Sequence, residues 1–133
     1  MAVQVTDTHP LLWYTAGHHR KLSPRALRLF EAADEDRGLI YVPAVALWET
    51  ALLARRGRIA LRDPFREWAE RLFHKRGFDL APLDVSVIEA AGALHFTQDP
   101  FDGAIVATAL TRELPLITAD GPIQRANVVE TIW

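Results

Sequence analysis

Four acidic residues stand out because each lies in or directly after an apolar stretch. Glu49 is the only charged residue in the segment 40–54, and Asp102 is the only charge in the run FDGAIVATAL. Asp7 and Asp120 follow the short runs VQVT and LPLIT. An ionised carboxylate buried without a partner is costly, so such a group is retained when it is neutral, paired or bound to a cation. We therefore expect all four carboxylates to be partly buried and to act together.

Each of these acids also has a structural explanation. Asp7 and Asp120 could cap the helices that follow them. Asp102 could add negative charge to the first turn of a helix, and Glu49 could pair with a distant arginine. Taken together, two acids at strand ends and two on helices favour a metal site at one sheet edge, because oxygen-only ligands suit Mg²⁺ or Mn²⁺. Without the ion, mutual repulsion is expected to raise their pKa values.

The elements that must position these acids follow from the Pro, Gly and capping residues along the chain. Strands are predicted over 2–6, 39–42, 78–83, 115–118 and 128–132. Helices are predicted over about 9–14, 24–37, 43–54, 64–76, 85–94 and 100–112, four of them with an N-cap at Ser23, Asp63, Asp84 or Asp99. Strands separated by one or two helices predict an α/β fold of three layers, with a central, mostly parallel sheet of about five short strands and helices on both faces. Asp7 and Asp120 fall at strand carboxyl ends, where such sheets bind ligands.

The composition limits the class of protein. The 133 residues are expected to form one domain, 1–133, and an apolar share of 50% with 24% charged residues excludes a disordered or low-complexity chain. A net charge of −2 gives no global signal for nucleic acid or a membrane surface. The absence of cysteine excludes disulfides, thiolate nucleophiles and zinc sites with cysteine ligands, and it fits a reducing cytoplasm. No apolar run reaches the roughly 20 residues of a membrane span and no export signal is visible, so we expect a soluble, cytoplasmic protein that does not bind membranes.

Positive charge is concentrated in one segment. Directly after the helix of Glu49 come four arginines with no acid among them, Arg55, Arg56, Arg58 and Arg62. They could contact an RNA backbone or an acidic segment of a protein partner. A solvated helix end explains only the first two of them.

Large apolar side chains lie on the helices near this segment: Trp13, Trp48, Phe65, Trp68, Leu72 and Phe73. Core packing is their default interpretation. Phe65, Trp68 and Leu72 share one helical face, so they could also line a groove for a partner helix or a second copy of the chain.

Four segments of the chain resemble the PIN-domain nucleases, and within them the VapC-type toxins of bacterial toxin-antitoxin pairs. They are TDTHPLLW, ALWETALLARRGRI, DPFDGAIVATAL, and LPLITAD with the closing VVETIW. Their order and spacing match the family over nearly the entire chain. The resemblance implies a PIN-like fold and an Mg²⁺- or Mn²⁺-dependent ribonuclease that hydrolyses phosphodiester bonds in RNA. It also implies a homodimer and a cognate antitoxin that holds the enzyme inactive.

The resemblance assigns the family's catalytic acids to Asp7, Glu49, Asp102 and Asp120. Asp7, Asp102 and Asp120 are the expected metal ligands. Glu49 is expected to bind a second ion or to orient the attacking water. In this chemistry the metal polarises the scissile phosphate and activates a bound water, and the 3′-oxygen leaves.

Asp99 is the ambiguous acid, because DPFD offers two carboxylates. The run that follows Asp102 matches the family's apolar helix better, which leaves Asp99 as a helix cap or as support outside the ligand set. Thr6, Thr8 and Thr118 flank the acids and could orient them, although a threonine at a strand end more often bonds locally.

Two further residues bear on this assignment. Gly103 stands where many relatives carry a basic residue, so one contact of the family with phosphate or with a partner is expected to be missing here. His9 is the only histidine close to the acids in sequence, and it is equally well explained as a surface residue or as an accessory to the site.

Two other functions compete with the nuclease. A catalytically silent RNA- or protein-binding module of PIN-like fold would use the arginines and leave the acids as structural groups. An aspartyl-phosphate phosphotransferase needs an acid two residues after the nucleophile at the strand end, and His9 occupies that position here.

Overall fold

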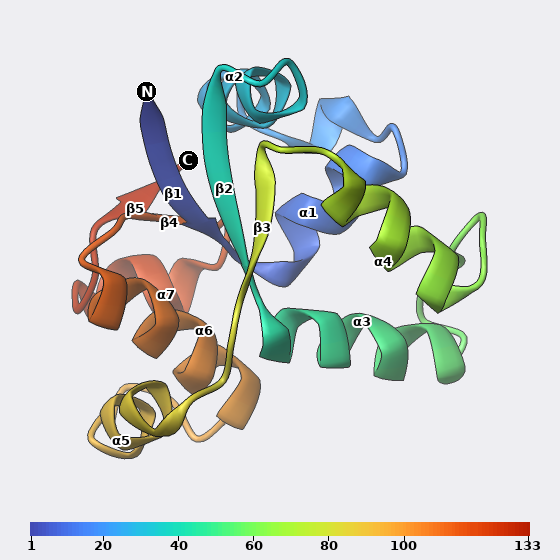
Figure 1. Cartoon of the computed structure of the whole chain (residues 1–133). Helices are drawn as coiled ribbons and strands as arrows, with labels where there is room; N and C mark the ends of the chain where they lie inside the picture. The colour runs from blue at the N-terminus through green and yellow to red at the C-terminus, as the bar shows by residue number, and fades with distance from the viewer.

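A five-stranded parallel sheet in the order β3-β2-β1-β4-β5 forms the centre of the protein (Figure 1). The structure is a computed structural model that describes all residues, 1–133. The strands are β1 (Ala2–Thr6), β2 (Gly38–Pro43), β3 (Phe78–Ala81), β4 (Leu116–Ile117) and β5 (Thr131–Ile132). The last three are shorter than predicted, because a strand extends only where a neighbour is aligned to pair with it.

Seven helices surround the sheet, and the predicted α/β architecture is confirmed. They are α1 (Thr8–Thr15), α2 (Pro24–Asp34), α3 (Ala44–Arg55), α4 (Phe65–His74), α5 (Val85–Gly92), α6 (Pro100–Arg112) and α7 (Gly121–Ala126), with a single 3₁₀ turn, η1 (His19–Lys21). None of these helices is both long enough and apolar enough to cross a membrane.

Two hydrophobic cores, one on each face of the sheet, create the three layers. The first core joins the sheet to α1, α2 and α4 around the fully buried Phe30 and Leu11. The second joins it to α6, α7 and the start of α3 around the fully buried Ile105 and Ile123. Figure 1 shows α1 and α4 on one side of the sheet and α6 and α7 on the other.

Most helices begin where the local sequence predicts. The side chains of Ser23, Asp84 and Asp99 each accept a hydrogen bond from a backbone N–H in the first turn of α2, α5 or α6. The prediction that Asp63 caps α4 is wrong: Pro64 occupies the cap position, and Asp63 instead pairs with Arg71 at 3.1 Å.

The sequence patterns missed η1 and gave no bounds for α7, the helix that Asp120 was expected to be able to cap. Helix α7 has the same signature as α6, an aspartate followed within two residues by proline, Asp120-Gly121-Pro122. The signal was therefore present, and the shortness of the helix hid its periodicity.

The order of the strands brings the candidate acids together. From β1 the chain runs outward through β2 and β3, then returns to the other side of β1 to form β4 and β5. The carboxyl ends of β1 and β4 are neighbours, with Thr6 paired to Ile117. Asp7 and Thr118 come directly after these paired residues. Ligands of parallel α/β sheets bind at such a switch point.

Candidate functional site

Asp7 lies at the centre of the site, at the carboxyl end of β1. Its side chain is 7% exposed and both oxygens are engaged. Oδ1 accepts a hydrogen bond from the backbone N–H of Thr8 at 2.8 Å, so Asp7 is the N-cap of α1, and Oδ2 accepts one from the Thr118 hydroxyl at 2.7 Å. Burial raises the pKa of Asp7 even though both hydrogen bonds oppose the shift. The carboxylate is therefore rigidly held in a position unfavourable to its charge.

Asp120 follows β4 and caps α7. Its Oδ1 accepts a hydrogen bond from the N–H of Ile123 at 2.9 Å, and its own N–H donates to the Thr118 hydroxyl at 3.0 Å. Thr118 thus donates to Asp7 and accepts from Asp120. One buried hydroxyl links the two acids at the strand ends.

Glu49 approaches from the middle of α3 and is half-buried. The Thr8 hydroxyl donates to its Oε1 at 2.5 Å, whereas Oε2 has no hydrogen-bond partner. Burial raises the pKa of Glu49, the bond from Thr8 lowers it, and the charge of Asp7 raises it. The first turn of α1 therefore positions this acid, as it does Asp7.

Asp102 lies in the first turn of α6 and is the acid without a donor. No hydrogen bond or ion pair involves its side chain. Burial, followed by the negative charges of Asp99, Asp7, Asp120 and Glu49, raises the pKa of Asp102 from 3.8 to about 7. The four acids identified in the sequence therefore lie close enough to act on one another electrostatically.

Asp99 and Thr6 lie outside this group. Asp99 is exposed and caps α6 by accepting from the N–H of Phe101 at 2.8 Å, while its charge raises the pKa of Asp102. The Thr6 hydroxyl donates to the backbone carbonyl of Asp7 at 2.9 Å and not to its carboxylate.

The donor set suits a hard cation, although the ligands are not closed around one point. In the positions they occupy, no three acid or imidazole side chains could share one metal ion. No lysine or arginine pairs with any of the four acids, and Asp102 and Oε2 of Glu49 have no partner. Oxygen-only donors with uncompensated charge fit Mg²⁺ or Mn²⁺. Binding such an ion requires side-chain rotation, and no hydrogen bond or ion pair holds the Asp102 side chain in its present position.

The predicted contact arginines are not equivalent. Arg55 and Arg56 lie exposed at the end of α3, whereas Arg58 and Arg62 line a cavity beside α1. None of the four forms an ion pair.

The large apolar side chains near these arginines divide into core and surface. Trp68 and Leu72 are buried, and Trp13, Phe65 and Phe73 pack against the same core. For Trp48 the core interpretation is wrong: its side chain is 59% exposed and meets Phe101 edge to face, with ring centroids 5.3 Å apart. Because α3 projects beyond the sheet, only one face of this helix is covered, and Trp48 lies on the uncovered face.

Comparison with known proteins agrees with this geometry. The chain matches the PIN domain family over residues 5–128. It is 36% identical over 138 aligned positions to Ribonuclease VapC22 of Mycobacterium tuberculosis, and the match covers 100% of both proteins.

Solved structures show the same fold at low sequence identity. VapBC2 from Rickettsia felis bound to a promoter DNA fragment matches with a TM-score of 0.66 and 11% identity, covering 98% of this chain and 97% of the other. VapBC-5 from Mycobacterium tuberculosis matches with a TM-score of 0.59 and 22% identity, covering 99% and 98%. From the family match along most of its length and from its full-length relative, the chain belongs to the PIN-domain family.

Proposed function

We propose that the chain is a metal-dependent endoribonuclease of the VapC type and the toxin of a toxin-antitoxin pair. The observation that carries this proposal is that Asp102, which has no hydrogen-bond or ion-pair partner, lies close to the acids at the carboxyl ends of β1 and β4. A full-length relative at 36% identity that is a ribonuclease supports the same activity.

The proposed metal ligands are Asp7, Asp102 and Asp120, with Mg²⁺ or Mn²⁺ as the ion. Glu49 binds a second ion or orients the attacking water. When bound, the metal polarises the scissile phosphate and lowers the pKa of a coordinated water.

The other side chains of the site hold these acids in place. Thr118 fixes the carboxylate of Asp7, and Thr8 fixes that of Glu49. Oε2 of Glu49 has no partner and the pKa of Glu49 is raised, so this oxygen is suited to accept a proton from water. Asp99 acts from outside the ligand set, through its charge and its cap on α6.

Cleavage of a structured RNA by the purified protein tests this function. We expect activity with Mg²⁺ or Mn²⁺ and none in EDTA. The variants Asp7→Asn and Asp102→Asn should be inactive although their circular dichroism spectra show that they are folded. An Asp84→Asn variant, altered at the cap of α5, should keep full activity. Metal-independent cleavage, or full activity of either site variant, would contradict the assignment. RNA binding without any cleavage would identify a catalytically silent binding module.

The partner proteins follow from the same proposal. Neighbours of similar fold are toxin-antitoxin complexes, among them one from Klebsiella pneumoniae with a TM-score of 0.66, 17% identity and coverage of 98% and 96%. We therefore propose a cognate antitoxin and action on RNA in the cytoplasm. Arg55 and Arg56 are candidates for contacting an acidic antitoxin segment.

A homodimer is the second proposed assembly. Helix α5 exposes Val85 at 81% and Ile88 at 55%, an apolar surface that a second copy would cover. Sedimentation analysis should show a dimer that Ile88→Lys dissociates and that Glu89→Lys, on the same helix, leaves intact. A monomeric wild-type protein would contradict this assembly.

A further inference from the structure

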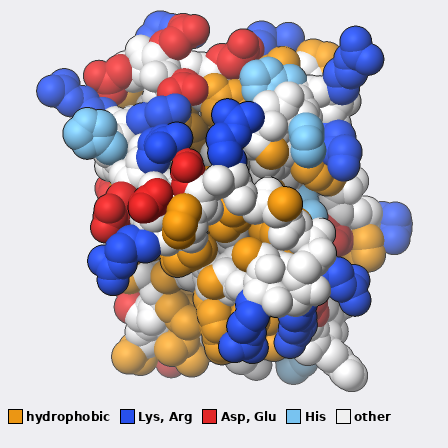
Figure 2. Space-filling model, turned by 90° about the vertical axis from the view of Figure 1, so that its right-hand side faces the viewer, with side chains coloured by type: hydrophobic (Ala, Val, Ile, Leu, Met, Phe, Trp, Pro, Cys, Tyr) orange, Lys and Arg blue, Asp and Glu red, His pale blue; other side chains and the backbone are white.

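A cavity of about 930 Å³ opens between α1, η1, the loop after α3 and α4. Its floor consists of the buried side chains of Leu12, Trp68, Leu72 and Phe78. Figure 2 looks onto this side of the molecule and shows Lys, Arg and His side chains around apolar surface. The cavity therefore combines an apolar interior with a positively charged rim.

Aromatic and imidazole rings form much of its wall. Trp13 and Tyr14 are half-buried, and His9 and His19 are exposed. The rings of His9 and Trp13 have centroids 6.0 Å apart, and those of Tyr14 and His19 stack nearly parallel at 5.2 Å. Phe30 stacks on Tyr14 as well, with ring centroids 5.0 Å apart, so the rings of Trp13 and His9 are the ones left for a nucleobase to stack on.

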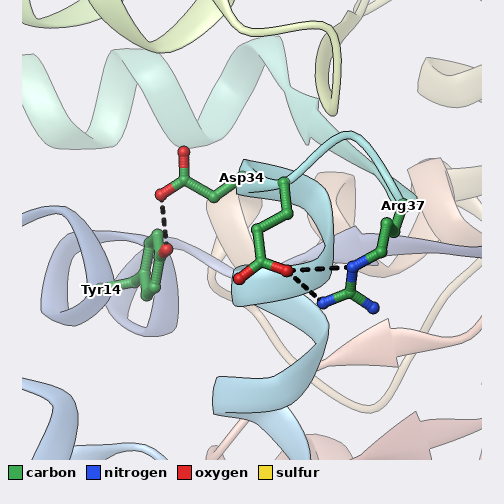
Figure 3. Close-up of polar contacts among 4 residues, drawn as sticks. Tyr14, Asp34 and Arg37 are labelled. Carbon is green, nitrogen blue, oxygen red and sulfur yellow. Dashed lines mark hydrogen bonds and ion pairs between the residues drawn. The ribbon is translucent and has the colours of Figure 1, made fainter.

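Tyr14 is fixed in this wall by its hydroxyl. It donates to Oδ2 of Asp34 at 2.6 Å, as Figure 3 shows, and Oδ1 of Asp34 pairs with Lys75 at 2.7 Å. Asp34 therefore neutralises Lys75, just as Asp63 neutralises Arg71 on the same rim.

Three cations of the lining remain without an acidic partner: Lys21, Arg58 and Arg62. All three are exposed, and Nζ of Lys21 lies 5.9 Å from the ring centroid of Trp13. Unpaired cations next to ring faces give a ligand both a phosphate contact and a stacking surface.

The cavity approaches the acid cluster along α1. His9 lines the cavity, and its charge also acts on Asp7 and Glu49. Trp13 lies one helical turn further along, on the same face as His9. His9 is therefore the side chain that adjoins both the acid cluster and the cavity.

We propose that this cavity binds one nucleotide of single-stranded RNA adjacent to the scissile phosphate, with its base against Trp13 and His9 and its phosphate at Lys21, Arg58 and Arg62. The inference rests on the proposed ribonuclease function. The cavity volume lies within the range of small-ligand sites. Rings in its wall, together with its position beside the acids, favour a nucleotide over an acidic peptide segment.

Binding of an unstructured, fluorescently labelled RNA octamer in EDTA tests this inference separately from cleavage. We expect Trp13→Leu to weaken binding by about tenfold, because it removes one stacking surface. Trp48→Leu, at an exposed tryptophan away from the cavity, should bind as the wild type does. Cleavage can fail while this binding persists, so failure of the proposed function and failure of the nucleotide site are distinguishable.

The salt dependence of binding provides a second measurement that does not rely on a partly buried residue. Each lost phosphate contact on a single strand lowers the slope of log K against log salt by about 0.7. Arg58→Ala with Arg62→Ala should therefore lower the slope by about 1.4. Arg25→Ala with Arg28→Ala removes the same charge from exposed positions on α2 and should leave the slope unchanged.

Two outcomes would overturn the nucleotide site. One is equal loss of slope in both double variants, which would mean that only net charge matters. The other is that the cavity variants keep the RNA affinity and the salt slope of the wild type, whether or not they lose affinity for an acidic peptide. In that case the cavity serves a protein partner or none.

Discussion

Replacing Asp102 by asparagine should stabilise the metal-free protein at alkaline pH. Burial and four nearby carboxylates raise the pKa of Asp102 from 3.8 to about 7. Asparagine keeps the size of the side chain and removes the charge that the surroundings disfavour. The expected gain is therefore electrostatic and depends on pH.

The direction of this dependence follows from proton binding. The folded-state pKa of Asp102 lies above the unfolded value, so the folded protein binds this proton more tightly than the unfolded chain does. The resulting stabilisation is fully present below about pH 4 and is lost as the pH rises through about 7. The difference between wild type and variant should therefore be smaller at pH 5 than at pH 8, where the variant should be the more stable.

The magnitude is limited by solvent. For a fully enclosed group, a shift from 3.8 to about 7 corresponds to about 4 kcal/mol. Because Asp102 is only half-buried, screening reduces this to about 1 to 2 kcal/mol. For a chain of this length, the melting temperature at pH 8 should rise by about 4 to 8 °C.

Calorimetry of wild type and Asp102→Asn in EDTA at pH 5 and pH 8 measures this effect. Comparison at the same pH cancels the titration of the groups that do not interact with Asp102. Addition of Mg²⁺ at pH 8 should raise the melting temperature of the wild type more than that of the variant, because a ligand that binds only the folded state stabilises it. An equal difference in melting temperature between the two proteins at both pH values would refute this electrostatic explanation.

Three further variants test the site and its scaffold. Asp99→Asn keeps a competent cap on α6, so it should reduce metal-dependent RNA cleavage only partially, whereas Asp102→Asn should abolish it. Thr118→Val removes the hydrogen bond to Asp7, so chemical denaturation should show a loss of about 2 kcal/mol and cleavage should fall about tenfold. Gly77→Ala places a Cβ 1.8 Å from a carbonyl oxygen of α2, so the free energy of unfolding should fall by about 3 kcal/mol.

Matched variants serve as controls for these predictions. Thr118→Ser retains the hydroxyl and should restore cleavage, which a purely steric role would not explain. Gly92→Ala introduces a Cβ into open space at the end of α5 and should raise the free energy of unfolding by up to about 1 kcal/mol. Equal cleavage by the Asp99 and Asp102 variants would show that the assignment within DPFD is mistaken.

The sequence by itself determined the fold class and the helix starts at Ser23, Asp84 and Asp99. These caps bond to N–H groups two or three residues away, so a short window contains both partners. The four acids were also visible in the sequence, because a charge in an apolar run is unusual wherever the run lies. Their burial and raised pKa values at Asp7, Glu49 and Asp102 agree with that expectation.

Only the tertiary structure decided how the acids are supported. Thr118 bonds to Asp7 across 111 residues and Thr8 bonds to Glu49 across 41, and both contacts depend on the order of strands around β1. Spacing along the chain does not specify that order.

Dependence on long-range packing also explains why two sequence predictions were wrong and why the cavity was not predicted. Asp63 has a cap signature but pairs with Arg71, and Trp48 is apolar but exposed, because each depends on which surface faces it in space. The cavity likewise combines α1, η1, the loop after α3 and α4, segments that are brought together only by packing against the shared core. Local sequence fixes which groups a segment offers, whereas burial and long-range contacts fix which of them meet.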